Sequence, residues 1–281
     1  MKQREANVDI LDRLFWTVQP PKGMIKGDFY RAENWFAPHY DGDDGYLGIL
    51  EVACLDGRIA YVEFTEINSS SYYIKRYQNV SKRRSDYSFF QATKKRTAES
   101  GVVLVNGLTH LENQMMKENR LTGTFDLLTG ASNSIKRSML PLAEEIAGQI
   151  HKPSGVRFYS LSQEIQPGVT AWLRVQYADG RLIDVFYDEV FADKQEAIED
   201  VELKPYYRQS KYNCLDYIST IGIGFNSFSD LIGRRAIESQ RLVGIEGIPF
   251  TAGDKVAQEW RHFEMLAEEI KSEMLCDGLL I

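Results

Sequence analysis

The sequence contains an internal repeat, and this repeat constrains the fold more than any other feature. In the first copy a run of alternating apolar residues is broken by Asp56-Gly57 and ends at Glu66. The same pattern returns 123 positions later, broken by Asp179-Gly180 and ending at Glu189, with nine matched positions and no gap. Apolar residues at period two on both sides of an Asp-Gly pair are typical of a β-hairpin. The chain is therefore predicted to contain two copies of one antiparallel unit.

The fold class that follows is α+β. We expect two related units, each an antiparallel β-hairpin or sheet packed with helices, plus a C-terminal amphipathic helix. The predicted hairpin strands are 48–55 with 59–64, and 171–177 with 182–187. Helices are predicted at 92–100, at 108–120 with a buried stripe of Leu111, Met115 and Met116, and at 254–275 with Asp254 as its cap. The last helix is predicted to cover the core or a subunit contact, as in a homo-oligomer.

Turn signals divide the chain into three parts. His151-Lys152-Pro153-Ser154-Gly155 marks a boundary between the two repeats. We predict an N-terminal extension at 1–40, a first repeat at 41–152, and a second repeat with the C-terminal helix at 153–281. Within the extension, a short amphipathic helix is expected to end at Pro20-Pro21.

The charge balance excludes some classes of partner. The net charge of −7 argues against a general nucleic-acid-binding protein. The basic clusters Lys82-Arg83-Arg84 and Lys94-Lys95-Arg96 are interpreted as solvated surface. Most hairpin carboxylates are likewise expected on solvent faces, namely Glu63, Glu66, Asp184, Asp188 and Glu189.

No segment is expected to enter a membrane. The longest aliphatic runs are too short to span a bilayer, and the first residues do not resemble a signal peptide. We therefore expect a cytoplasmic protein, or an extracytoplasmic one if a leader has been removed.

Several kinds of reactive site have no sequence basis. Three cysteines lie far apart and form no CxxC pair, and Cys54 is interpreted as a buried apolar residue. The four histidines show no metal-binding spacing, and no GxSxG motif provides a nucleophile. We therefore predict neither a metal site nor a hydrolase triad.

One short stretch does carry a chemical signal. Residues 126–134 read Asp-Leu-Leu-Thr-Gly-Ala-Ser-Asn-Ser. The Gly130-Ala131 pair leaves the neighbouring hydroxyl of Ser132 unshielded, and glycine allows a close backbone approach. Apolar residues at helical spacing follow, so Ser132 is predicted to begin a helix. A phosphate on Ser132 would then meet unpaired backbone N–H groups and the positive end of the helix dipole.

This stretch resembles the flavinylation motif of the FMN-binding domain family, which includes one subunit of the sodium-pumping NADH:quinone oxidoreductase and the pheromone-precursor lipoproteins. The matches in type and spacing are Asp126, Thr129, Gly130, Ala131 and Ser132. The resemblance implies that Ser132 bears FMN through a phosphoester, where the family usually has threonine. It also implies a separate flavin transferase that uses FAD and magnesium. In this interpretation Asp126 assists recognition, while Thr129 and Ser134 form hydrogen bonds near the phosphate.

The implied function is electron transfer through FMN to or from an unidentified redox partner protein, as a carrier more than a stand-alone enzyme. Two alternatives stay open: a flavin-free binding or scaffold module on the same fold, and a reductase with non-covalent FMN. In the second repeat, aligning 216–227 with the motif places Gly222 or Asn226 at the acceptor position. The second unit is therefore expected to carry no covalent flavin. Gly222-Ile223-Gly224 is predicted to be a turn before a helix.

Overall fold

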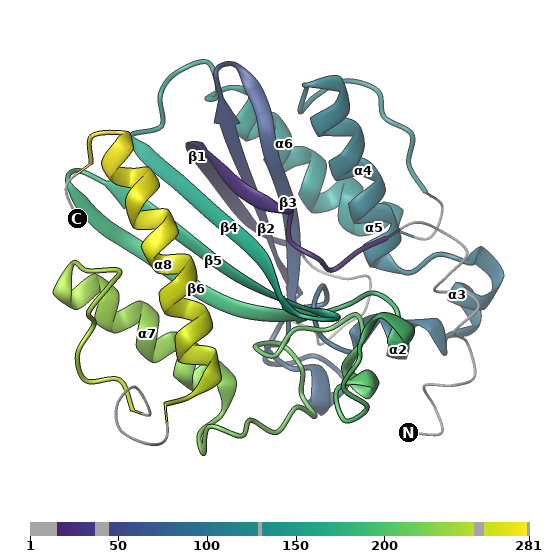
Figure 1. Cartoon of the computed structure of the whole chain (residues 1–281). Helices are drawn as coiled ribbons and strands as arrows, with labels where there is room; N and C mark the ends of the chain where they lie inside the picture. Colours follow the sequence, from purple (N-terminus) through teal and green to yellow (C-terminus); the bar gives the residue numbers. More distant parts are fainter. Residues whose placement is uncertain (1–15, 37–44, 129–130, 250–255, 280–281) are drawn as a thin grey trace. The chain divides into compact units, whose positions relative to one another are not determined.

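The computed structural model describes residues 16–36, 45–128, 131–249 and 256–279, which form an α+β fold (Figure 1). Six strands are hydrogen-bonded in the order β3-β2-β1-β4-β5-β6. The pairs β2–β3, β1–β4, β4–β5 and β5–β6 are antiparallel. The strands are β1 (Gly23–Phe36), β2 (Tyr46–Leu55), β3 (Arg58–Asn68), β4 (Val156–Gln166), β5 (Val169–Ala178) and β6 (Arg181–Phe191).

Helices follow each group of strands. After β3 come η2 (Lys75–Tyr77), α2 (Tyr87–Ala92), α3 (Lys95–Ser100), α4 (Leu104–Glu118), α5 (Ser132–Ser134), the π-helical turn η3 (Ile135–Met139) and α6 (Leu140–Ala147). After β6 come η4 (Gln195–Ala197), η5 (Lys204–Tyr206), α7 (Phe225–Ser239) and α8 (Gln258–Cys276).

The chain forms two compact units. Unit 1 comprises residues 1–18 and 30–154, and unit 2 comprises residues 19–29 and 155–281. Strand β1 contributes to both: Gly23–Asp28 pair with β4 in unit 2, and the rest of β1 from Tyr30 onward belongs to unit 1. Part of the predicted extension at 1–40 is therefore a sheet strand. The division in the chain falls after Ser154, two residues beyond the predicted end of the first repeat.

Both predicted hairpins are confirmed. Asp56 and Gly57 have φ values of 50° and 75°, and Asp179 and Gly180 have 51° and 76°. Positive φ at both central residues is the requirement of a two-residue hairpin turn that matches the twist of its strands. Each hairpin also has a register shift at the same place, between Ala53 and Cys54 in β2 and 123 positions later in β5.

The two units share a second device, at the end of the helix that packs beside each hairpin. Asn119 and Gln240 terminate α4 and α7 with φ values of 52° and 56°. The Asn119 side chain accepts from Ile59 N at 2.7 Å and donates to Gly57 O at 3.1 Å. The Gln240 side chain accepts from Leu182 N at 2.7 Å and donates to Leu182 O at 3.1 Å. In both units one amide side chain thus ties the helix end to the start of the second hairpin strand.

A third shared device covers the outer edge of each hairpin. Ser81 bridges Ile67 in unit 1, and Ser210 bridges Val190 in unit 2. The next residue donates its backbone N–H to the strand, Lys82 to Glu66 O at 2.9 Å and Lys211 to Glu189 O at 2.8 Å. Covering an edge strand in this way removes a template for unwanted pairing. The hairpin turn, the amide at the helix end and the covered edge thus recur in both units, in agreement with the sequence repeat.

This equivalence corrects one alignment made from the sequence. Because α7 occupies in unit 2 the place of α4 in unit 1, the segment 216–227 precedes the first long helix and does not correspond to 126–134. The equivalent of 126–134 lies between α7 and α8, where 250–255 are outside the described residues. Gly222-Ile223-Gly224 is a turn before a helix, as predicted, with Gly224 as the N-cap of α7.

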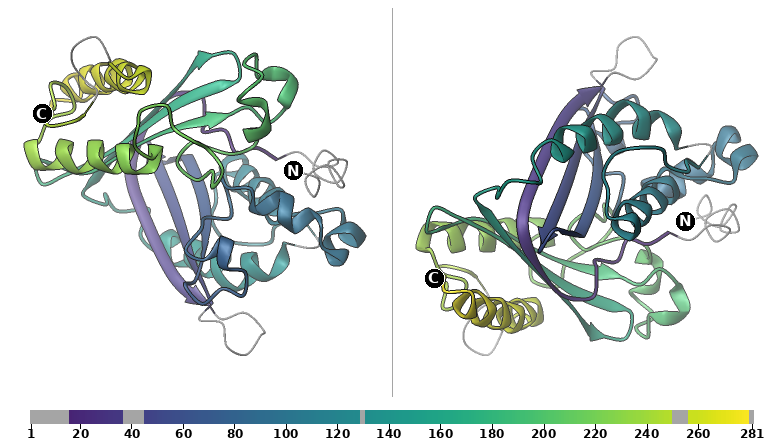
Figure 2. Two further views of the ribbon diagram at one scale, coloured as in Figure 1. Left: turned by 90° about the horizontal axis from the view of Figure 1, so that it is seen from below. Right: turned by 90° about the horizontal axis from the view of Figure 1, so that it is seen from above.

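Each unit has its own hydrophobic core. In unit 2, α7 and α8 lie side by side over one face of β4, β5 and β6 (Figures 1 and 2). In unit 1, α4 packs on β3, while η3 and α6 pack on β2. Of the stripe predicted for the first long helix, Leu111 and Met115 are buried in the core of unit 1, while Met116 is half-buried. The apolar face of the C-terminal helix is buried in the core of unit 2 through Trp260, Phe263, Leu266, Ala267 and Ile270.

Element boundaries differ from the predictions in several places. Helix α8 begins at Gln258 with Ala257 as its N-cap, and the predicted cap Asp254 lies outside the described residues. The predicted helix at 92–100 is two short helices, α2 and α3, with Gly101 ending the second at φ 67°. Strands β1 and β4 were not predicted. The helix expected before Pro20 is not seen at residues 16–21, and residues 1–15 lie outside the described part.

The hairpin carboxylate Glu189 is buried, which contradicts the expected solvent face. Its Oε1 accepts from Tyr187 Oη at 2.6 Å and lies 3.0 Å from His262 Nδ1, while Lys211 Nζ lies 2.7 Å from its Oε2. Burial by itself would raise the pKa of Glu189, but the charge of Lys211 and three hydrogen bonds outweigh burial and lower it to about 2. A buried carboxylate is tolerated here because it is paired. The same correction applies to three further hairpin carboxylates that are buried, Glu63, Glu66 and Asp188.

The lowered pKa of Glu189 makes unit 2 sensitive to acid. A carboxyl group whose pKa is lower in the folded state than in the unfolded state stabilises the fold at pH values above its unfolded pKa. For Glu189 the unfolded pKa is near 4.5, and the stabilisation is lost as the pH falls from this value through about 2. The contribution is roughly 3 kcal/mol. We expect the difference in free energy of unfolding between the wild type and Glu189→Gln to shrink as the pH is lowered from 5 to 2. Urea unfolding at several pH values measures this difference, and a constant value would contradict the prediction.

Candidate functional site

The loop that leads into 126–134 is held by Arg120, which follows α4. The guanidinium donates to Thr122 O at 2.7 Å and to Thr124 O at 2.6 Å, and it lies 4.1 Å from the centroid of the Phe125 ring. Gly123 has a φ of 110°, and a Cβ at this position would meet the Arg120 guanidinium. The loop therefore wraps around one cationic side chain, which bonds two of its carbonyl groups.

Asp126, the first residue of the motif, is fixed through its backbone. Asp126 N donates to Gln114 Oε1 at 3.0 Å, and Gln114 Nε2 donates to Asp126 O at 2.8 Å. The Asp126 side chain itself is exposed. One glutamine amide on α4 thus satisfies both backbone groups of Asp126 and leaves its carboxylate facing solvent.

Ala131 marks the other end of the segment and is buried against α4. A Cβ at Gly107 would lie inside van der Waals contact of the Ala131 Cβ. The absence of a side chain at Gly107 therefore allows the segment to approach the helix backbone. The exposed fraction of Ala131 is 2%. A larger residue at either position would push the segment away from α4.

A helical segment begins at Ser132 and continues through the π-helical turn into α6, which ends at Ala147. Pro141 is the second residue of α6, and the backbone on both sides of it is helical, so the restart of the helix predicted at Pro141 is not seen. The π-helical turn lies close to the backbone of β2 at Gly48, because Gly48 has no side chain. A Cβ at this position would collide with Ser138 Oγ. Ser138 Oγ in turn donates to Asn34 Oδ1 at 2.6 Å.

The predicted site residues are therefore only partly described. Ser132 is the first residue of a helical segment, as the sequence predicts; its side chain is not among the described parts of the structure. Asp126 is exposed, Ala131 is buried and Ser134 is half-buried. Thr129 and Gly130 lie outside the described residues.

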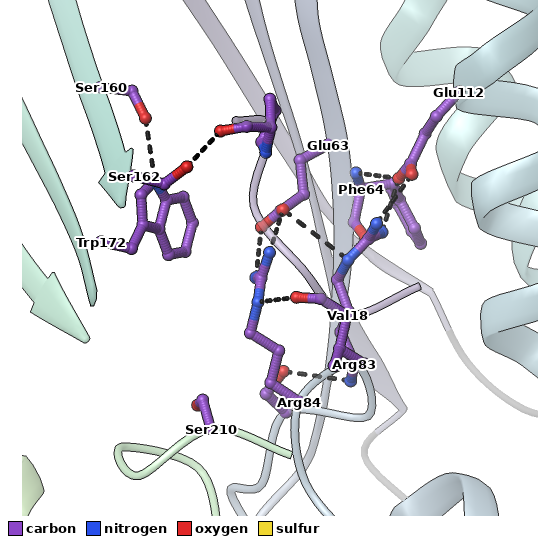
Figure 3. A network of polar contacts seen from close by, with 12 residues as sticks. Val18, Glu63, Phe64, Arg83, Arg84, Glu112, Ser160, Ser162, Trp172 and Ser210 are labelled. Atoms are coloured by element: carbon purple, nitrogen blue, oxygen red, sulfur yellow. Dashed lines mark hydrogen bonds and ion pairs between the residues drawn. The ribbon is translucent and has the colours of Figure 1, made fainter. Parts of the chain in front are cut away.

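A second cluster of polar residues lies in the interior of unit 1 and contradicts the expected solvated surface (Figure 3). Arg83 is 5% exposed and donates to both carboxylate oxygens of Glu112, at 2.6 and 2.8 Å. Glu112 Oε1 also accepts from Phe64 N at 2.8 Å, and Arg83 donates to Phe64 O at 3.1 Å. Arg83 and Glu112 together satisfy both backbone groups of Phe64.

The adjacent Arg84 forms an equivalent pair with Glu63. Its guanidinium donates to Glu63 Oε1 at 2.7 Å and to Oε2 at 2.5 Å, and its Nε donates to Val18 O at 3.0 Å (Figure 3). Burial by itself would lower the pKa of Arg83, but the negative charges of Glu112 and Glu63 raise it by more. The net pKa is therefore above the ordinary value, and the guanidinium stays charged. The prediction that Lys82-Arg83-Arg84 is solvated surface was wrong, because a single sequence does not show which carboxylate forms an ion pair with each cation.

Lys82 completes this run and is also buried. Its ammonium pairs with Glu66 and lies 3.5 Å from the Tyr46 ring centroid and 5.1 Å from that of Tyr87. Cation–π contacts of this kind stabilise a desolvated ammonium. By contrast, the other predicted basic cluster, Lys94–Arg96, is exposed as expected. The buried cluster of unit 1 is a set of ion pairs, which favours a structural role over a reactive one.

Three residues that organise the motif were missed by the sequence analysis: Gly107, Gln114 and Arg120. Gly107 and Gln114 are spaced by seven positions and therefore share one side of α4. A glycine inside a helical run was a usable signal, because it often marks a close backbone approach. Nothing in the sequence indicated that Gln114 contacts the backbone of Asp126. Chemically, the arrangement presents a helix start after an anchored segment, which suits a phosphate group.

The described residues contain neither a helix with the length and apolarity needed to cross a bilayer nor a group of three metal-ligating side chains. No family model and no curated protein match the chain. The chain is similar to the crystal structure of the CPE2226 protein from Clostridium perfringens at 20% identity and a TM-score of 0.33, over 46% of this chain and 93% of that one. This degree of likeness carries no argument about fold or function.

Proposed function

We propose that the protein is an FMN-binding electron carrier whose flavin is joined to Ser132 by a phosphoester. The observation that carries the proposal is the position of Ser132 at the start of the helical segment, directly after the small residue Ala131 packed on α4. The first N–H groups of a helix lack intrahelical partners, and its dipole favours an anion at this end. These properties support a phosphate at Ser132.

Neighbouring side chains fit the same group. Lys136 and Arg137 are exposed within the next turn of the segment, and their charges favour a phosphate nearby. The exposed carboxylate of Asp126 is available to a modifying enzyme, which is the role that the resemblance implies. Thr129 and Ser134 would donate hydrogen bonds near the phosphate, and Gly130 would leave the acceptor accessible. The redox chemistry would belong to the isoalloxazine ring, while the protein supplies position and electrostatics.

The proposal is tested by intact mass and visible absorbance of the protein isolated from its own host. A mass increment of FMN less water, mapped to the peptide that contains Ser132, is the expected result. Ser132→Ala is expected to abolish covalent flavin, while Ser132→Thr, which restores the usual family residue, is expected to retain it. Asn133→Ala provides a neighbouring control at an exposed position and is expected to retain the flavin.

Other outcomes separate the alternative functions. Covalent flavin that persists in Ser132→Ala would contradict the assignment of the acceptor. Flavin colour that is lost on denaturation would indicate a protein with non-covalent FMN, and NAD(P)H oxidation would then identify a reductase. A colourless, unmodified protein from its own host would leave the flavin-free binding module.

A further inference from the structure

We propose that unit 2 contains an internal water site at the side-chain amide of Gln209. This site is separate from the segment 126–134 and does not depend on flavin attachment. Gln209 lies directly before Ser210, in the segment that covers the outer edge of β6. Its exposed fraction is 0%, and neither its Nε2 nor its Oε1 has a hydrogen-bond partner among the described residues.

An amide that is buried without partners destabilises a fold. The hydrogen bonds that it makes to water in the unfolded chain are lost and not replaced, so buried polar groups are nearly always paired with protein or with ordered water. The amide side chains of Asn119 and Gln240 follow this rule, since each both accepts and donates. Gln209 departs from the rule, and we therefore expect its partner to be a molecule that is not part of the chain.

The backbone pairing shows on which side of the edge segment the Gln209 side chain lies. Phe191 N donates to Gln209 O at 2.9 Å, and Lys211 N donates to Glu189 O at 2.8 Å. Gln209 is therefore opposite Phe191, and Lys211 is opposite Glu189. Side chains alternate along an extended segment and opposed residues share a face, so all four side chains lie on one face. The ion pair between Lys211 and Glu189 is in agreement with this placement.

The surroundings of the amide favour a small, neutral ligand. The centroid of the Phe191 ring lies 5.6 Å from that of Tyr206 and 5.8 Å from that of Tyr217, so this side of the segment is largely aromatic. The Lys211 ammonium is already paired with two carboxylates. The amide offers both donors and an acceptor, and a ligand that satisfies it must also accept and donate. Water does both and fits a polar site closed to solvent, whereas a simple anion only accepts.

Unit 1 provides a natural comparison at the same place. Asn68 N donates to Val80 O at 3.1 Å, and Phe191 N with Gln209 O is the equivalent contact of unit 2. Unit 1 thus has its amide on the strand and an apolar residue on the edge segment, while unit 2 has the reverse. The Asn68 amide donates to Tyr77 O at 3.0 Å, so this donor has a partner within the chain. Valine in the edge segment of unit 1 also shows that the segment forms without an amide there.

The test compares the crystal structures of three full-length proteins: the wild type, Gln209→Met and the control Gln195→Met. Methionine has nearly the length of glutamine but forms no strong hydrogen bond. Gln195 is an exposed glutamine of the same unit. We expect density for a water molecule within about 3.2 Å of Gln209 Nε2 or Oε1 in the wild type and in Gln195→Met. This water should be absent from Gln209→Met.

The midpoint of thermal unfolding gives a second readout. If water pairs with the amide, Gln209→Met removes the amide and its partner together, and the midpoint should stay the same or fall. If the amide were unpaired, the substitution would remove a buried penalty and raise the midpoint by more than about 2 °C. A raised midpoint would therefore overturn the inference. A wild-type structure without water at the amide, or with the amide bonded to another side chain, would also overturn it.

Discussion

Glu112→Ala is expected to lower the free energy of unfolding by about 3–5 kcal/mol, because it leaves a buried charge without its partner. Arg83 would lose both hydrogen bonds to the Glu112 carboxylate, and Phe64 N would lose its acceptor. The measurement is urea unfolding followed by circular dichroism. Glu112→Gln should cost less, because its amide oxygen can still accept from Phe64 N.

The matched control is Glu118→Ala on the same helix. Glu118 is exposed and pairs with Arg120 near the surface, so its loss should cost no more than about 1 kcal/mol. A double variant, Glu112→Leu with Arg83→Met, removes both charges and should recover part of the loss. If Glu112→Ala were no less stable than Glu118→Ala, the buried pair would not contribute to stability as described.

Gly233→Ala is expected to destabilise unit 2 by about 2 kcal/mol or more, although alanine is the better helix former. Helix propensity alone favours alanine by about 1 kcal/mol. A Cβ at Gly233, however, would lie inside van der Waals contact of the backbone oxygen of Val185. Because β6 is held by its pairing with β5, the strand cannot yield easily, and overpacking costs about 1–3 kcal/mol or more. Thermal unfolding followed by circular dichroism measures the change.

Gly148→Ala tests the same substitution where space is available. Gly148 has a helical φ of −67°, and a Cβ there would meet neighbours only at ordinary contact distances of 3.4 Å and more. This variant should be neutral or more stable by up to about 1 kcal/mol. A Gly233→Ala protein as stable as Gly148→Ala would show that α7 can move away from β6 at little cost.

The repeated hairpins were accessible from the sequence because their signals are local. Period-two alternation reports which side of a strand is buried, and an Asp-Gly pair reports the backbone conformation of the turn. The register shift shared by β2 and β5 shows how closely the local sequence copies the local geometry. Helices α4 and α8 were predictable for the same reason, since their apolar stripes recur at helical spacing.

Strand β1 and the buried ion pairs were not accessible in this way. β1 is defined by its partners: Gly23–Asp28 pair with Arg157–Ser162 of β4, more than 120 residues later in the chain. Lys82-Arg83-Arg84 looks like a solvated run until three glutamates from β3 and α4 are placed against it. A charged residue is buried only where a partner far along the chain compensates its desolvation, and periodicity carries no information about that partner.

The candidate site likewise has features that local sequence predicts and features that depend on contacts between elements. The sequence by itself determined the motif, the helix that begins at Ser132, and the duplication of the unit, because each depends on residues adjacent in the chain. Only the tertiary structure decided that α4 holds the segment, with Gly107 receiving Ala131 and Gln114 binding Asp126. It also decided which part of unit 2 corresponds to 126–134. The physical reason is that contacts between elements depend on the path of the backbone through space, which local patterns in a single sequence do not encode.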